Sequence, residues 1–267
     1  MRLIPDKEMN FYKTYHYHMF KNVNDKWAFV ICPKTFDFDA YCPLCAVTSK
    51  LYQGSGADKP KAYQMKRKRK HCVNSYIKKD PRDENNENKS VGKVLVYEFP
   101  DAVEKKIKAE MNDEEYGAGV NIFEPGKEGV DFILKVGATK PLPDGPNKGK
   151  SFPNYDLSTF ANKAMALGTD DQINVIMEST HNLDEYLKNM SKTDEELVNI
   201  IKDEMLFSLI EEDYNRIHKI VPETKESHNP LDDMDEIPDE KKKITSPSKD
   251  TEDEISDEDL LSELDNL

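Results

Sequence analysis

The sequence has no run of 18 apolar residues, which is about the length that a membrane-spanning helix needs. Its first residues also lack the basic stretch followed by an apolar stretch that is typical of a secretory signal. We see no internal repeat. These absences argue against a membrane span and against export, and they predict a protein that stays inside the cell.

Cysteine is scarce and unevenly placed. Three of the four cysteines, Cys32, Cys42 and Cys45, lie close together, and the last two form a Cys-x-x-Cys pair. In an intracellular chain this spacing favours a metal site over a disulfide framework. Two alternatives stay open, namely cysteines that are small buried core residues and a redox Cys-x-x-Cys pair, although the βαβ context of the latter is lacking.

The net charge of -14 is distributed very unevenly. Residues 1–80 contain 16 Lys and Arg against 7 Asp and Glu, whereas residues 231–267 contain 4 against 15. The overall acidity therefore hides a basic N-terminal region that can attract a polyanion. Beyond Pro222 the chain has few aromatic residues, so residues 223–267 are predicted to be a disordered acidic protein-interaction tail, and residues 1–222 the folded core.

Short strands dominate the first half of the core. Alternating apolar residues at 14–20, a turn at 22–25 and the apolar segment 27–31 predict a β-hairpin, and a short helix is expected over 46–52. Further strands are predicted at 63–77, 93–99 and 131–136, with a helix at 102–111, a loop at 137–153 and helices over 157–220. The pattern predicts a mainly β fold with added helices, built on a small OB-type barrel.

The three clustered thiols need a fourth ligand if they bind one zinc ion tetrahedrally. His18 is the best candidate because its hairpin partner runs directly into Cys32, and His16 is the second. His71 and Cys72 are also eligible. With four protein ligands no coordination position stays open, so the predicted zinc subdomain, at about residues 14–52, is structural.

Five consecutive cations, Lys66 to Lys70, precede His71 and lie between Tyr63 and Tyr76. Cations neutralise phosphates and rings stack on bases, a combination that suits an unpaired nucleic acid strand of any sequence. A nuclear-type targeting signal and a solvated charge run are the alternatives. We find no recognition helix of the kind that reads duplex DNA.

These residues resemble the T-even-type bacteriophage single-stranded DNA-binding proteins. The similarity rests on His18, Cys32 and Cys42-Pro43-Leu44-Cys45, on the basic strand with Lys79-Asp80-Pro81, on Tyr97-Glu98-Phe99, and on the acidic, leucine-punctuated end at 257–267. The resemblance implies an OB-fold barrel with an inserted zinc-binding subdomain, a helical C-terminal part and a disordered acidic tail. It also implies one structural Zn²⁺ ion held by His18, Cys32, Cys42 and Cys45.

The resemblance further implies a set of DNA-contacting residues. They are Arg2, Tyr52, Tyr63, Lys66, Arg67, Lys68, Tyr97, Phe152 and Tyr155. The basic run itself adds His71 and also Arg69 and Lys70, which stand where the family has two hydroxyl residues. There are departures: His71 and Cys72 stand where the family has a Tyr-Trp pair, and the hairpin after His18 is one residue longer. The sequence also starts at the first barrel strand, without the family's basic N-terminal arm, so we expect weak cooperativity at most.

The implied function is binding without catalysis. The protein is expected to coat single-stranded DNA in the cytoplasm of an infected bacterial host during replication, recombination and repair. The acidic tail would recruit replication and recombination proteins and would compete for the DNA cleft, and the protein's own mRNA is a further possible ligand. The alternatives are an RNA-binding translational regulator and a zinc-dependent nucleic-acid enzyme. Such an enzyme needs an open metal position or clustered carboxylates, and we find neither in the sequence.

Overall fold

The computed structural model describes residues 1–85, 89–139, 141 and 148–219. Residues 1–139 and 152–220 form one compact unit, and everything below concerns that unit. The predicted acidic tail, 223–267, lies outside the described residues. In the part of the chain that is described, we find no helix with the length and apolar character needed to cross a membrane.

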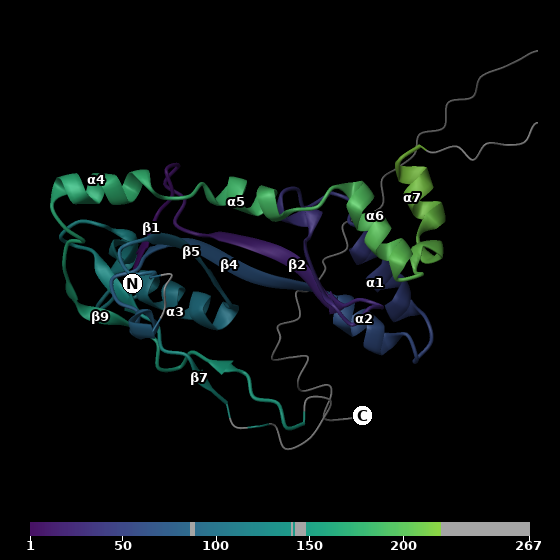
Figure 1. Cartoon of the computed structure of the whole chain (residues 1–267), viewed down its shortest axis with the longest axis horizontal. Helices are drawn as coiled ribbons and strands as arrows, with labels where there is room; N and C mark the ends of the chain where they lie inside the picture. The colour runs from purple at the N-terminus through teal and green to yellow at the C-terminus, as the bar shows by residue number, and fades with distance from the viewer. Residues whose placement is uncertain (86–88, 140, 142–147, 220–267) are drawn as a thin grey trace, which may run out of the picture. The chain divides into compact units, whose positions relative to one another are not determined.

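The fold is mainly β with added helices, as predicted (Figure 1). The strands are β1 (Arg2–Ile4), β2 (Lys13–Lys21), β3 (Trp27–Ile31), β4 (Arg67–Tyr76), β5 (Val94–Phe99), β6 (Val130–Ile133), β7 (Gly137–Ala138), β8 (Pro153–Asn154) and β9 (Thr159–Ala164). The α-helices are α1 (Pro43–Gln53), α2 (Lys59–Met65), α3 (Asp101–Asn112), α4 (Asp170–Glu178), α5 (Leu183–Met190), α6 (Asp194–Asp203) and α7 (Glu211–Ile217).

Strand β4 is the centre of a five-stranded antiparallel sheet. It pairs with β5 along one edge and, along the other, first with β2 and then with β1, while β3 continues the sheet beyond β2. Backbone hydrogen bonds between Met1 and Phe132 then connect the β1 end to β6, which pairs with β9. The sheet therefore curls into a half-barrel, and the predicted OB-type architecture is confirmed in this form.

Side chains of β4 alternate between the two faces of the sheet, because successive residues of a strand point to opposite sides. Odd-numbered residues such as Val73 pack with Phe99 and with Val103 and Ile107 of α3. Even-numbered residues such as Cys72 pack with Leu183 and Leu187 of α5. We call these sides the α3 face and the α5 face; Figure 1 shows α3 and α5 on opposite sides of β4.

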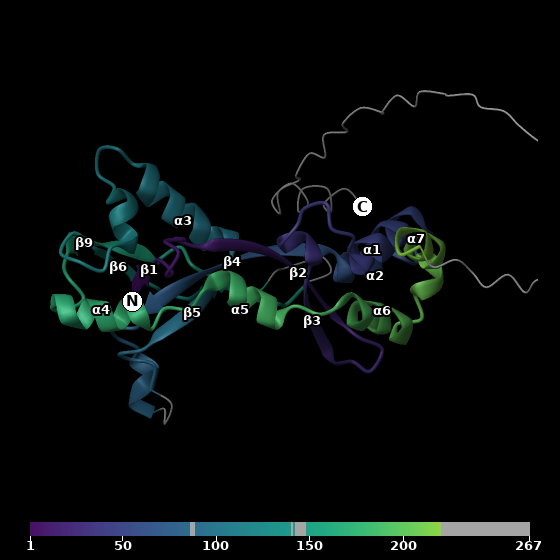
Figure 2. The ribbon, with the colours of Figure 1, turned by 90° about the horizontal axis from the view of Figure 1, so that it is seen from above.

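Helix α5 packs on the α5 face, whereas α6 packs against α1 and the β2–β3 hairpin. α4, α5 and α6 follow along the sheet in both views (Figure 2). Thr169 and Thr193 begin α4 and α6 with capping boxes, in which the threonine hydroxyl accepts from the backbone N–H of Gln172 or Glu196 and that residue's side chain accepts from the threonine N–H. Asn182 begins α5 in a similar way by accepting from the N–H of Glu185. These polar caps fix where each helix starts.

A third apolar cluster lies where the β2–β3 hairpin meets the helices. It joins Phe20 and Val30 of the hairpin to Leu44 and Val47 of α1, Met65 of α2 and Leu197 and Ile201 of α6. Two of the three clustered cysteines, Cys32 and Cys42, are buried in it. The hairpin agrees with the prediction; its turn begins at Asn22, whose side chain accepts from the N–H groups of Asn24 and Lys26.

Two predicted elements were wrong in part. Residues 59–65 form a helix where we expected a strand to begin at residue 63, and Pro60 and Asp58 at its start fit that outcome. Residues 159–164 form strand β9 where helix was expected, because Phe160 is needed opposite Phe132 in the half-barrel core. The other predicted strands and helices are present, with β6 ending at Ile133 instead of 136.

Candidate metal centre and nucleic-acid interface

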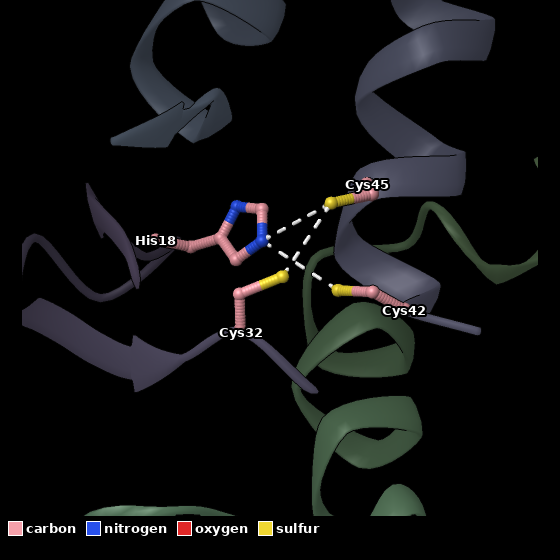
Figure 3. A group of neighbouring side chains, drawn as sticks. All are labelled: His18, Cys32, Cys42 and Cys45. Carbon is pink, nitrogen blue, oxygen red and sulfur yellow. Dashed lines mark hydrogen bonds between the residues drawn. The ribbon is translucent and has the colours of Figure 1, made fainter. Parts of the chain in front are cut away.

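One imidazole and three thiols converge where the hairpin meets α1 (Figure 3). His18 comes from β2, Cys32 directly follows β3, Cys42 precedes α1 and Cys45 lies in its first turn. Their ligand atoms all lie within 4.8 Å of one another. The Sγ atoms of Cys32 and Cys45 are 3.7 Å apart, and His18 Nε2 lies 3.5 Å from the Sγ atoms of both Cys42 and Cys45.

The orientation of the His18 ring is fixed by its other nitrogen. Nδ1 lies 2.7 Å from the carbonyl oxygen of Met65, the last residue of α2, so Nδ1–H donates there and Nε2 is directed at the sulfurs of Cys42 and Cys45. A second partner of this kind is typical of metal-binding histidines. Of the two histidines considered from the sequence, the structure brings His18, and not His16, into the cluster.

Hydrogen bonding shifts the pKa values of the clustered groups in different directions. Hydrogen bonds with Cys42 and Cys45 lower the pKa of Cys32, whereas hydrogen bonds with Cys32 and Cys45 raise the pKa of Cys42. Burial lowers the pKa of His18, but hydrogen bonds to Cys32 and Cys45 outweigh it and raise the pKa to about 9. The cluster is thus a buried group of polar atoms in which negative charge on one sulfur is stabilised by neighbouring donors, and such a group can hold a metal ion.

The five predicted cations do not share one surface. Arg67 and Arg69 stand opposite His18 and His16 of β2 and belong to the α3 face. Lys68 and Lys70 stand opposite Tyr17 and Tyr15 and belong to the α5 face, where the Lys70 ammonium lies 5.3 Å from the Tyr17 ring centre. Lys66 precedes the strand and lies 4.4 Å from the ring centre of Tyr63.

Two of the predicted DNA-contacting rings, Tyr97 and Tyr155, lie on the α3 face of the sheet. Tyr97 stacks on Phe99 with ring centres 5.6 Å apart, and Tyr97 and Tyr155 both pack against the core of that face. Phe152, next to β8, is 42% exposed, and Tyr63 of α2 is 48% exposed. Tyr52, near the end of α1, is 44% exposed. The side of the sheet that carries Arg67 and Arg69 therefore also carries the half-buried rings of Tyr97 and Tyr155, while the exposed rings of Phe152, Tyr63 and Tyr52 come from outside the five-stranded sheet.

Arg2 does not serve as a phosphate contact in this structure, and that prediction is corrected. Its side chain is fully buried; the guanidinium forms an ion pair with Asp131 and donates to the carbonyl oxygens of Glu124 and Met165 at 2.6 and 2.8 Å. Gly129 gives it room, since a Cβ there would overlap the guanidinium. Arg2 therefore holds the β1–β6 end of the half-barrel together.

Replacing Arg2 with glutamine is expected to lower the free energy of unfolding by about 2 to 5 kcal/mol, because the carbonyl groups of Glu124 and Met165 lose their buried donor and Asp131 is left with Lys78 as its cationic partner. Chemical denaturation of the variant and the unchanged protein measures this difference. A small loss of stability together with a reduced salt dependence of DNA binding would contradict the assignment and restore a phosphate-binding role.

His71 is also corrected, because it is fully buried and cannot stack on a base. Its Nε2–H donates to Asp101 Oδ1 at 2.8 Å and its Nδ1 accepts from the Thr14 hydroxyl at 2.9 Å. The ring stacks on Phe99 inside the core. Although burial raises the pKa of Asp101, hydrogen bonds from Arg69 and His71 outweigh it and lower that pKa.

His71, Asp101 and Glu104 form a second cluster with ligand atoms within 4.8 Å of one another. Its carboxylates already have cationic partners, since Arg69 binds Asp101 and Lys108 lies 2.9 Å from Glu104. A divalent ion here would therefore meet two resident cations, and we assign the cluster to the packing of α3 on β4. This cluster was not predicted from the sequence, because His71 of β4 is 30 residues from Asp101 and meets α3 only in the folded chain.

Comparison with known protein families matches residues 1–205 to the family described as gp32 DNA binding protein like. The chain belongs to this family. A search of curated proteins found no match. The gp32-like match covers every strand of the sheet and the buried cluster of His18, Cys32, Cys42 and Cys45, and its limit lies just after α6. The half-barrel and the cysteine cluster are thus parts of a gp32-like DNA-binding domain.

Proposed function

We propose that the chain is a sequence-nonspecific single-stranded DNA-binding protein that acts by binding alone. The gp32-like match over residues 1–205 is the observation that carries this proposal. The α3 side supports it, because Arg67, Arg69 and Lys66 can neutralise phosphates beside the rings of Tyr63, Tyr97 and Phe152. Each stacked base would add about 1 to 3 kcal/mol, without a preference for one base.

Zinc is the ion that we propose for His18, Cys32, Cys42 and Cys45. Zinc bonds of about 2.3 Å to sulfur and about 2.0 Å to nitrogen place tetrahedral ligands about 3.8 Å apart for two sulfurs and about 3.5 Å apart for sulfur and nitrogen. The distances of 3.7 and 3.5 Å in the cluster fit those edges. Bound there, zinc would supply a structural crosslink between β2, the end of β3 and α1.

His18 and the three cysteines would then hold the ion with four protein ligands. His18 binds through Nε2 because Met65 holds its Nδ1–H, and the three thiols would bind as thiolates. Since α2 carries both Met65 and the exposed Tyr63, a fixed cluster also fixes a ring that we propose contacts DNA. Metal binding and DNA binding are coupled in this way through one short helix.

In the cell, this binding would coat exposed single strands of phage DNA during replication, recombination and repair, in the cytoplasm of the bacterial host. We propose that the acidic tail, 223–267, recruits replication and recombination proteins and competes with DNA for the basic face. A tethered polyanion competes at high effective concentration, so a protein ending at Pro230 should bind DNA more tightly. The protein's own mRNA is a possible additional ligand.

Titration of the full chain with fluorescent oligo-deoxythymidine at several salt concentrations tests the proposed function. We expect tight binding at low salt, a steep loss of affinity as salt rises, and weak binding of a duplex of equal length. Tighter binding of oligouridine would favour an RNA-binding protein, and cleavage of the oligonucleotide with divalent ions would favour an enzyme. Absence of binding in dilute buffer would overturn the proposal.

A further inference from the structure

Arg69, a cation of the α3 face, already binds a carboxylate. Its Nε donates to Asp101 Oδ1 at 3.2 Å and its Nη2 donates to Asp101 Oδ2 at 3.0 Å. This fork is the geometry with which an arginine binds two oxygens of a phosphate. The pair is accessible, with 41% of the Arg69 side chain and 30% of the Asp101 side chain exposed.

Asp101 is held in place by more than Arg69. It is the first residue of α3, and it also accepts a hydrogen bond from the buried His71. Its neighbour Glu104 is anchored as well, by Lys108 and by the Tyr12 hydroxyl at 3.2 Å. A phosphate that reaches Arg69 therefore meets a carboxylate that cannot swing away without breaking the packing of α3 on β4.

We propose that Asp101 is a resident competitor for phosphate at Arg69, so that DNA binding at this position exchanges a protein ion pair for a DNA ion pair. The inference rests on the proposed single-stranded DNA binding. At a partly exposed site, a like charge a few ångströms from the phosphate costs on the order of 1 kcal/mol. Asp101 thereby limits the contribution of Arg69 to affinity.

The exchange of ion pairs also changes how DNA affinity depends on salt concentration. Each phosphate neutralised on a single strand releases about 0.7 of a counterion, which weakens binding as salt rises. Breaking an exposed Arg–Asp pair has the opposite dependence, because salt screens that pair and makes it easier to open. The unchanged protein should therefore show a smaller salt slope than its number of cations on the α3 face implies.

Asp101→Asn tests the proposal, because asparagine keeps the shape and can still bond to Arg69 but carries no charge. We expect oligo-deoxythymidine affinity at low salt to rise roughly fivefold and the slope of log affinity against log salt to steepen by about 0.7. Asp184→Asn is the matched control: Asp184 also pairs with a lysine of β2, Lys13 at 3.0 Å, but belongs to α5 on the other face. It changes the net charge equally and should change neither quantity.

A double-mutant cycle with Arg69→Gln separates competition from a general effect. In the Arg69→Gln background, Asp101→Asn should lose most of its effect on affinity and slope. Equal behaviour of Asp101→Asn and Asp184→Asn, or weaker binding by Asp101→Asn, would overturn the competitor role while the unchanged protein still binds DNA. If the unchanged protein itself does not bind, it is the proposed function that fails.

Discussion

Replacing Arg67 and Arg69 together with glutamine is expected to weaken binding of single-stranded DNA on the order of 30-fold at moderate salt. The slope of log affinity against log salt should fall by about 0.7, because the counterion release at Arg67 is lost while that at Arg69 is already offset by its pair with Asp101. Both arginines belong to the α3 face, where the rings of Tyr97 and Tyr155 also lie. Fluorescence anisotropy with labelled oligo-deoxythymidine at several salt concentrations measures affinity and slope together.

The matched control comes from the same strand. Lys68→Gln with Lys70→Gln removes the same charge from the same segment, but these lysines belong to the α5 face, where Lys70 lies 3.7 Å from Glu98. We expect a change of no more than about threefold and a nearly unchanged salt slope. Equal losses from the two double variants would show that only the net charge of the strand matters, and would contradict a one-sided binding face.

Replacing Cys45 with serine is expected to abolish stoichiometric zinc binding and to lower the melting temperature by about 10 °C or more. The reason is that a structural metal site contributes its binding energy to folding, and a drop of about 4 kcal/mol shifts the melting of a domain of this size by roughly that amount. Metal analysis of the purified variant and a thermal melt followed by circular dichroism are the measurements. Because Met65 of α2 bonds to His18, DNA affinity should fall as well.

Cys72→Ser serves as the control for this variant. Cys72 is also fully buried, but it packs against α5 outside the cluster, and burial raises its pKa to about 12, as expected for an inert core thiol. The control should keep its full zinc content and lose only the small amount of stability that a polar substitution in the core costs. A zinc-free preparation of the unchanged protein that melts normally would contradict the structural role of the cluster.

Local sequence signals predicted the hairpin and the cysteine cluster well. Two short-range features carry the cluster: the spacing of the Cys-x-x-Cys pair, and the position of His18 opposite the strand that leads to Cys32. Both can be read from the hydrophobic period and the residue spacing of the sequence. The type of fold was also predictable, because several short strands in the first half of the chain favour a small β-barrel. Its closure through Met1 and Phe132 was not, because that contact joins residues 131 positions apart.

The division of the basic run between two faces could have been predicted from strand periodicity, but the run of charge was interpreted as one surface. Alternation in a strand sends Arg67 and Arg69 to one side and Lys68 and Lys70 to the other whatever the partners are. The burial of Arg2 and His71 was less predictable. It depends on Asp131, which pairs with Arg2, and on Asp101, which pairs with His71. Both carboxylates come from distant segments, so no local sequence pattern predicts these pairs.

Photocrosslinking of the full chain to oligo-deoxythymidine that contains 5-iodouracil, followed by mapping of the modified residues, tests the central claim most directly. The claim is that unpaired DNA lies on the side of the sheet that carries α3, Arg67 and Arg69. We predict crosslinks to Tyr97 and Tyr155 on that side and to the exposed rings of Tyr63 and Phe152. Crosslinks concentrated on Tyr17 and Tyr186, which pack on the α5 face, would contradict it.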